Sequence, residues 1–161
     1  MKTFRADLHV HTVLSPCAGI EMIPPLIVEE ALQRGIRLIA ITDHNASANV
    51  RAVQKAADGT GLTVLPGMEV QTHEDVHMLC LFASLLDLES WQHRVDLSLP
   101  DALNQPEHFG EQYVVDENGE YIRTETRLLL TATEFSIEEV IQQVGELGGL
   151  VIPAHVDRKS F

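Results

Sequence analysis

The order of apolar and amphipathic segments in the first half of the chain constrains its fold most. Apolar runs of strand length alternate with stretches of helical spacing, and the connections between them are short. This order favours parallel strands covered by helices. We expect strands at 7–12, 37–42, 62–65 and 76–82, and helices at 24–34 and about 46–57. The sequence therefore predicts an α/β fold with functional residues at the carboxyl ends of its strands.

Turn and cap signals divide the rest of the chain. Pro66-Gly67 predicts a turn directly after the third strand. Near the end, Ser136 and Glu139 have the spacing of a capping box and predict a helix that stops at Gly148-Gly149. A last apolar strand is expected at 150–154.

The middle of the chain departs from this rhythm. Residues 87–97 favour a helix, but the following segment has two prolines and little periodicity. A hairpin is expected at 113–122, around Asn118-Gly119. We interpret residues 98–130 as an insertion or lid.

Length and charge limit the class of protein. The 161 residues fit one domain, spanning 1–161. Eleven basic and 24 acidic residues give a formal charge of -13, which disfavours diffuse binding to nucleic acid or to anionic membranes. Such a protein binds phosphate only through metal ions or a few placed arginines. The N-terminus has no signal-peptide pattern, the longest apolar run, 78–86, is too short to span a bilayer, and the two cysteines fit reduced thiols, so we expect a cytoplasmic protein.

His9 and His11 lie two positions apart in the first alternating run. In a strand their side chains point to the same face, with Cα atoms about 6 to 7 Å apart. Two imidazole nitrogens at this spacing suit one metal ion. A partly buried strand whose polar face holds two histidines by chance gives the same pattern.

Further ligand-type residues stand at the ends of the other expected strands: His44, Glu69, His77 and His155. Each has an ordinary interpretation alone, as a hydrogen-bonded core histidine, a capping or solvated carboxylate, or a surface histidine. Burial of so many polar groups without partners would cost about 1 to 3 kcal/mol each. Metal ligation satisfies all of them at once.

Taken together, these segments resemble the PHP domain (polymerase and histidinol phosphatase) family. The matching segments are His9-Val10-His11-Thr12, Thr42-Asp43-His44, Gly67-Met68-Glu69, His77-Met78-Leu79 and Pro153-Ala154-His155. The resemblance implies a distorted (β/α)7 barrel, two or three divalent metal ions and phosphoesterase chemistry.

The resemblance also implies a ligand set. Carried over by position, His9, His11 and Glu69 would bind a first ion, Glu69, His77 and His155 a second with Glu69 bridging, and Cys17 and His44 a third. Cys17 stands where family members often have His or Asp. Because a thiolate binds zinc well, we favour zinc, with manganese or iron as alternatives. The alternative for Cys17 is a buried thiol beside Pro16.

Three other residues are candidates near the metals. Asp7 and Asp43 would accept imidazole N–H groups and fix ligand tautomers; a strand-edge charge and a helix N-cap are their alternatives. Arg158 would bind a phosphate oxygen through its bidentate fork, unless it is an ordinary surface arginine. With Glu69, we expect Asp43 and Arg158 to take part in catalysis.

One departure bears on completeness. The family's barrel normally closes with a late Asp-x-His pair, and no such pair follows His155 in the six remaining residues. Full barrels of this class usually need about 200 residues or more. We therefore expect an incomplete or C-terminally truncated barrel, or one completed by a second chain.

The resemblance leads to a functional hypothesis with alternatives. We expect hydrolysis of a phosphate ester by a metal-activated water, on a small phosphorylated substrate and without a membrane partner. One alternative is a catalytically incomplete metal-binding module with a structural or interaction role. Another is a nuclease acting on nucleic-acid ends, which the acidic charge disfavours. Amide hydrolysis would need a carboxylated lysine or a late aspartate, and no lysine stands at a strand end.

Overall fold

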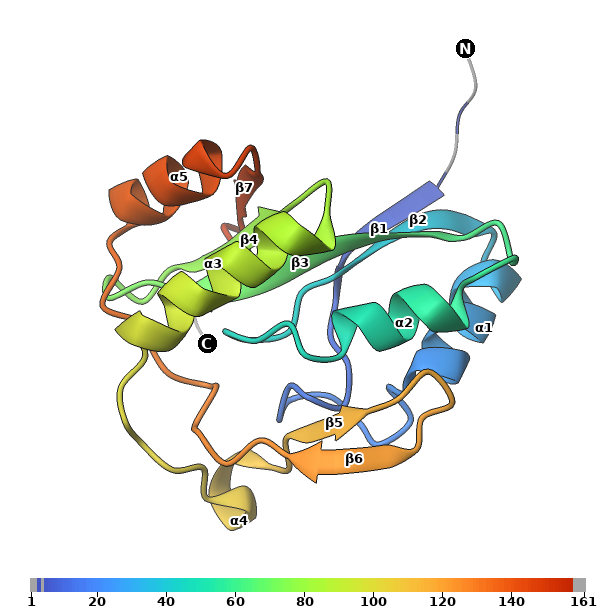
Figure 1. Cartoon of the computed structure of the whole chain (residues 1–161), viewed down its shortest axis with the longest axis horizontal. Coiled ribbons are helices and arrows are strands. Elements are labelled where there is room, and N and C mark those ends of the chain that lie inside the picture. Colours follow the sequence, from blue (N-terminus) through green and yellow to red (C-terminus); the bar gives the residue numbers. More distant parts are fainter. Residues whose placement is uncertain (1–2, 4, 158–161) are drawn as a thin grey trace.

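A single curled sheet organises the molecule, which we describe from a computed structural model (Figure 1). The structure describes residues 3 and 5–157. The elements are β1 (Arg5–Val10), α1 (Pro24–Gln33), β2 (Ile36–Ile41), α2 (Val50–Ala56), β3 (Thr63–Gln71), β4 (His77–Leu81), α3 (Leu85–Ser98), α4 (Pro106–Phe109), β5 (Tyr113–Val115), β6 (Tyr121–Thr124), α5 (Ile137–Glu146) and β7 (Leu150–Pro153).

The five strands of the main sheet lie in the order β1-β2-β3-β4-β7. Strands β1, β2 and β3 are parallel, as predicted, but β4 is antiparallel to both β3 and β7. The prediction of parallel strands was wrong at β4 because only five residues, 72–76, join it to β3. A parallel connection needs about a dozen residues or more, whereas five suffice for a hairpin. Within this turn the Thr72 amide donates to the Val76 carbonyl at 2.9 Å.

Pro66 and Gly67 lie inside β3, so the predicted turn between 62–65 and 68–70 was wrong. The Pro66 carbonyl accepts a hydrogen bond from the Phe82 amide at 2.9 Å. A Cβ at Gly67 would lie 2.9 Å from the Ile41 carbonyl oxygen and 3.0 Å from Cγ2 of Thr42. The glycine therefore permits close approach of neighbouring strands and does not make a turn.

Local signals placed most of the helices. Helix α5 begins with a complete capping box between Ser136 and Glu139, as expected. Helix α1 is followed by Gly35 in the left-handed region, at φ 69°. Helix α2 begins four residues later than the expected position 46, because Asn45 takes a left-handed conformation and residues 46–49 form a loop.

The core lies between the sheet and the helices packed on it. Figure 1 shows α2 and α3 across one face of the sheet. Three apolar residues of α3, Leu88, Trp91 and Val95, are fully buried. They pack in one cluster with Met68 of β3. Burial of such side chains contributes about 1.5 to 3 kcal/mol each and fixes the sheet on which the site stands.

The expected hairpin forms from β5 and β6, with Gly119 at its turn. It lies beside the loop that follows β1, because the Tyr113 amide donates to the Val13 carbonyl at 3.0 Å. The main sheet is curled into part of a barrel, since the ring centroids of His9 and His155, from opposite edge strands, lie 5.0 Å apart. This architecture confirms the expected α/β fold with an incomplete barrel-like sheet. Within the described residues, no helix combines the length and apolar character needed to cross a bilayer.

Candidate metal centre

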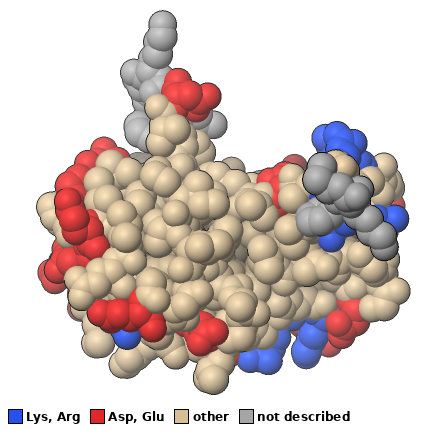
Figure 2. All heavy atoms as spheres, turned by 90° about the horizontal axis from the view of Figure 1, so that it is seen from above, with Lys and Arg blue, Asp and Glu red and all other residues tan. Residues whose placement is uncertain are grey.

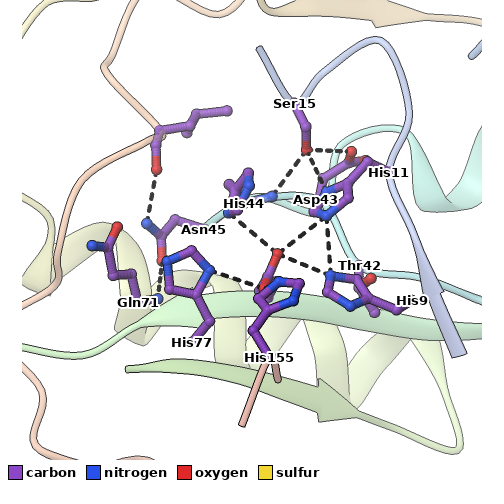
Figure 3. Close-up of polar contacts among 12 residues, drawn as sticks. His9, His11, Ser15, Thr42, Asp43, His44, Asn45, Gln71, His77 and His155 are labelled. Atoms are coloured by element: carbon purple, nitrogen blue, oxygen red, sulfur yellow. Dashed lines mark hydrogen bonds and ion pairs between the residues drawn. The ribbon is translucent and has the colours of Figure 1, made fainter. Parts of the chain in front are cut away.

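Five imidazole rings converge on the carboxylate of Glu69 (Figure 3). Glu69 has no exposed surface, so these rings and the sheet enclose it. Oε2 lies 3.1 Å from His9 Nε2, 3.1 Å from His11 Nε2 and 3.3 Å from His44 Nδ1, and Oε1 lies 3.0 Å from His77 Nδ1 and 3.4 Å from His155 Nε2. The structure thus brings together the six residues that the sequence placed at one centre by strand position.

The direction of the strands explains this convergence. Strands β1, β2 and β3 are parallel, so their carboxyl ends deliver His9, His44 and Glu69 to one edge of the sheet. His77 is the first residue of β4 and not, as expected, at its carboxyl end. It reaches the same edge because β4 runs antiparallel to β3. Strand β7 reverses direction again and carries His155 to this edge, where the Ala154 amide donates to the His77 carbonyl at 2.8 Å.

The electrostatics of the centre depend on Glu69. Burial acts to raise the pKa of Glu69, but contacts with His11, His77 and His9 and the charge of His44 together lower it below its usual range. Burial lowers the pKa of His44 to about 4. His44 is therefore neutral near pH 7 and keeps a nitrogen lone pair for a ligand.

The donor set fits a divalent metal ion. Oε2 of Glu69 has no hydrogen-bond partner of good geometry within the described residues, although three ring nitrogens surround it. The Nε2 atoms of His9 and His11 face each other at 3.1 Å. A cation between these atoms would satisfy the oxygen and both nitrogens, as in carboxylate and imidazole sites generally.

Three groups of side chains have ligand atoms within 4.8 Å of one another: His9, His11 and Glu69; His44, Glu69 and His77; and His11, Cys17 and His44. Cys17 is exposed overall, but desolvation raises the pKa of its thiol. A cation bound nearby would favour the thiolate at this position.

The two aspartates differ from expectation in their contacts. The Asp43 carboxylate is fully buried and accepts hydrogen bonds from the Thr12 amide, the Thr12 hydroxyl and the Ser15 hydroxyl. It reaches His11 through Ser15 and not through the predicted direct imidazole contact. Burial raises the pKa of Asp43, while the charge of His11 and these hydrogen bonds act in the opposite direction. Asp7 is exposed and accepts from the backbone amide of His9 at 3.2 Å, again not from the ring.

Arg158, the predicted phosphate-binding residue, lies outside the described residues. Ser15, Asn45 and Asn49 make buried hydrogen bonds beside the candidate ligands, and no sequence motif marks them. Ser15 stands next to Pro16 and looked like an ordinary loop residue. Its position four residues after His11 was the available signal, but the contact depends on how the loop folds.

Comparison with known proteins agrees with this geometry. The family model of the PHP domain matches residues 7–149. A phosphoribosyl 1,2-cyclic phosphate 1,2-diphosphodiesterase of Eggerthella lenta is 32% identical over 80 residues, which cover 47% of this chain and 29% of that protein. A 5'-3' exoribonuclease Rnm of Salmonella typhimurium is 30% identical over 84 residues, which cover 51% of this chain and 28% of that protein. The matches thus span less than a third of the length of these relatives.

Solved structures share the fold. A protein of Bifidobacterium adolescentis assigned as a metal-dependent phosphoesterase aligns with a TM-score of 0.59 at 23% identity, over 96% of this chain and 68% of that one. The lesion-specific endonuclease Q of Pyrococcus furiosus aligns with a TM-score of 0.64 at 19% identity, over 94% of this chain and 34% of that one.

Proposed function

The chain belongs to the PHP domain family, and from this premise we propose that it is a metal-dependent hydrolase of phosphoester bonds. The observation that carries the proposal is the buried Glu69 carboxylate, which has one oxygen without a hydrogen-bond partner among the described residues and five imidazoles around it. A buried charge of this kind is costly unless it is paired or coordinates a metal.

The family resemblance suggests how the ions would be held. His9, His11 and Glu69 would hold one ion, and His77 and His155 would hold a second together with the other oxygen of Glu69. His44 and Cys17 would complete the set with a third. When bound, such ions act as Lewis acids and lower the pKa of an attacking water, so that no serine or cysteine nucleophile is needed. Zinc remains our preferred ion because of Cys17.

The chain's own residues provide orientation. One set of rings lies near Oε2 of Glu69 and the other near Oε1. Because the Glu69 side chain is buried, its two oxygens stay at fixed positions between the two sets. Asp43 holds the loop after β1 through two hydrogen bonds to Thr12. Arg158 stays our candidate for binding a phosphate oxygen.

The substrate is proposed to be a small phosphorylated molecule. The net charge of -13 disfavours long polyanions. The face in Figure 2 has acidic and basic side chains along its margins and uncharged residues across its middle. The relative from Eggerthella lenta, by its name, acts on a cyclic phosphate ester. Cleavage of nucleic acid is the second candidate, because one relative is named an exoribonuclease and a protein of similar fold is an endonuclease solved with a duplex substrate.

The test combines metal analysis with three phosphoesters. Protein purified without chelator is analysed for metal by mass spectrometry and assayed on a chromogenic phosphomonoester, a cyclic phosphodiester and an end-labelled oligonucleotide. We expect activity that is lost with chelator and restored by zinc or manganese. Outer-shell changes alone cost about 10- to 100-fold, so loss of a ligand in His9→Ala should remove at least about 100-fold of the activity together with bound metal.

The matched control is His93→Ala, which removes an exposed histidine from α3. Full activity of metal-stripped protein, or an unchanged His9→Ala variant, would exclude the proposal. Bound metal without turnover of any of the three esters would favour the incomplete metal-binding module. Cleavage of the oligonucleotide alone would favour the nuclease.

A further inference from the structure

Ser15 lies at the centre of a buried hydrogen-bond network that ends on His11 (Figure 3). Its side chain has no exposed surface. Three polar atoms surround its hydroxyl oxygen: Asp43 Oδ1 at 2.7 Å, the backbone nitrogen of His44 at 3.1 Å and Nδ1 of His11 at 3.0 Å. One hydroxyl thus contacts the loops after β1 and β2, each of which carries a candidate metal ligand.

The proton positions in this network follow from counting. A hydroxyl group has one proton to donate and two lone pairs to accept with. Ser15 donates its proton to the Asp43 carboxylate, which only accepts, and one of its lone pairs accepts from the backbone N–H of His44. The remaining lone pair faces Nδ1 of His11. That nitrogen must therefore carry a proton.

The contacts of Thr12 support Asp43 as a hydrogen-bond acceptor. The Thr12 hydroxyl accepts from Asn49 Nδ2 at 2.9 Å and from the Leu14 amide at 3.2 Å, so both of its lone pairs are used. Its own proton goes to Asp43 Oδ2 at 2.8 Å. The backbone amide of Thr12 donates to Oδ1 at 2.7 Å. With Ser15, Asp43 receives three hydrogen bonds, an arrangement that suits an ionised carboxylate.

We propose that Ser15 is a positioning residue that connects Asp43 to His11 and holds His11 as the tautomer protonated on Nδ1. In the neutral ring, Nε2 of His11 then keeps a lone pair, 3.1 Å from Glu69 Oε2 and 3.1 Å from His9 Nε2. This is the nitrogen that a metal ion held by Glu69 would need. The use of the lone pair for metal rests on the proposed function, but the tautomer itself does not.

The first test measures the tautomer in the metal-free protein. Two-bond ¹⁵N–¹H spectra of the histidine rings at mildly alkaline pH distinguish a proton on Nδ1 from one on Nε2. We expect wild-type His11 to be protonated on Nδ1, and Ser15→Ala to lose this preference in favour of Nε2. Ser98→Ala is the matched control, because Ser98 is also buried but donates to the Val95 carbonyl in α3. Ser15→Thr keeps the hydroxyl and should restore the wild-type spectrum.

The second measurement is the affinity for zinc. Outer-shell changes typically lower metal affinity about 10- to 100-fold, and we expect a loss of this size in Ser15→Ala but not in Ser98→Ala. Wild-type His11 protonated on Nε2, or a Ser15→Ala spectrum equal to that of the wild type, overturns the proposal. The wild-type spectrum decides the tautomer even if Ser15→Ala does not fold. If the expected tautomers are found but no metal binds, the proposed function fails while the role of Ser15 in setting the tautomer stands.

Discussion

Two buried polar regions of the molecule are built in opposite ways. In the first, Gln112 anchors the segment 99–133, and each polar atom of its side chain is paired. Its Nε2 donates to the carbonyls of Glu125 and Arg127, and its Oε1 accepts from the Leu129 amide at 3.0 Å. Around Glu69, Oε2 has three ring nitrogens near it and no hydrogen-bond partner among the described residues. Folding thus satisfies the polar atoms of the Gln112 side chain, whereas Oε2 of Glu69 stays available to a cation.

The difference suits the first region to stability and the second to the proposed metal binding. Asn45 lies between the two regions. Its Nδ2 donates to the carbonyls of Leu129 and Thr131 at 2.8 and 2.7 Å, and it directly follows His44. The satisfied amide of Asn45 thus fixes the segment 99–133 against the loop that carries the candidate metal ligand His44. A rigid support of this kind keeps ligands in place before the metal arrives.

The largest effect is expected from Glu69→Gln, which keeps the shape of the side chain but replaces an accepting oxygen with an N–H₂ donor. A ligand that binds only the folded state at about 100-fold above its Kd adds about 2.7 kcal/mol to the free energy of unfolding. We expect this metal-dependent gain in the wild type and the loss of most of it in Glu69→Gln. Urea unfolding with and without zinc measures both.

The control for this variant is Glu138→Gln, an exposed carboxylate on α5 that should keep the full metal-dependent gain. Equal stabilisation of wild type and Glu69→Gln by zinc would contradict the comparison, because it would place the cation elsewhere in the molecule.

An intermediate effect is expected from Gln112→Ala, which should act on stability alone. The variant leaves two carbonyls and one amide of the chain without partners, and unmade buried hydrogen bonds cost about 1 to 3 kcal/mol. We expect the free energy of unfolding to fall by about 2 kcal/mol while the metal stoichiometry stays that of the wild type. Gln142→Ala makes the same substitution on the surface of α5, where a change within about 0.5 kcal/mol is expected. Loss of metal in Gln112→Ala would show that the two regions are not separable.

The same contrast explains what the sequence predicted. The ligands at the Glu69 centre are recognisable by residue type and by their places at strand ends, so His9, His44 and His155 were assigned to one centre before the fold was known. The partners of Gln112 and Asn45 are backbone groups of residues distant in the chain, and no residue type marks them. Pro66-Gly67 misled for a related reason, because close packing against Ile41 and Thr42 overrides the local turn preference. The direction of β4 could have been predicted from its five-residue connection to β3.

The smallest effect on metal binding is expected at Cys17, the exposed cysteine at the edge of the Glu69 centre. Its sulfur lies within 4.8 Å of ligand atoms of His11 and His44, whereas the two groups that contain Glu69 do not include it. Cys17→Ala should therefore lower the zinc affinity of one site about tenfold, equivalent to about 1.4 kcal/mol, and leave the sites at Glu69 intact. Manganese binding should change less, because thiolates favour zinc.

Cys80→Ala provides the contrast, since Cys80 is fully buried in the apolar core and its loss should lower stability without changing zinc affinity. Isothermal titration calorimetry with zinc measures the affinity of both variants, and urea unfolding measures their stability. If Cys17→Ala leaves zinc affinity and stoichiometry unchanged, Cys17 is not a ligand. Our reason for preferring zinc is then removed.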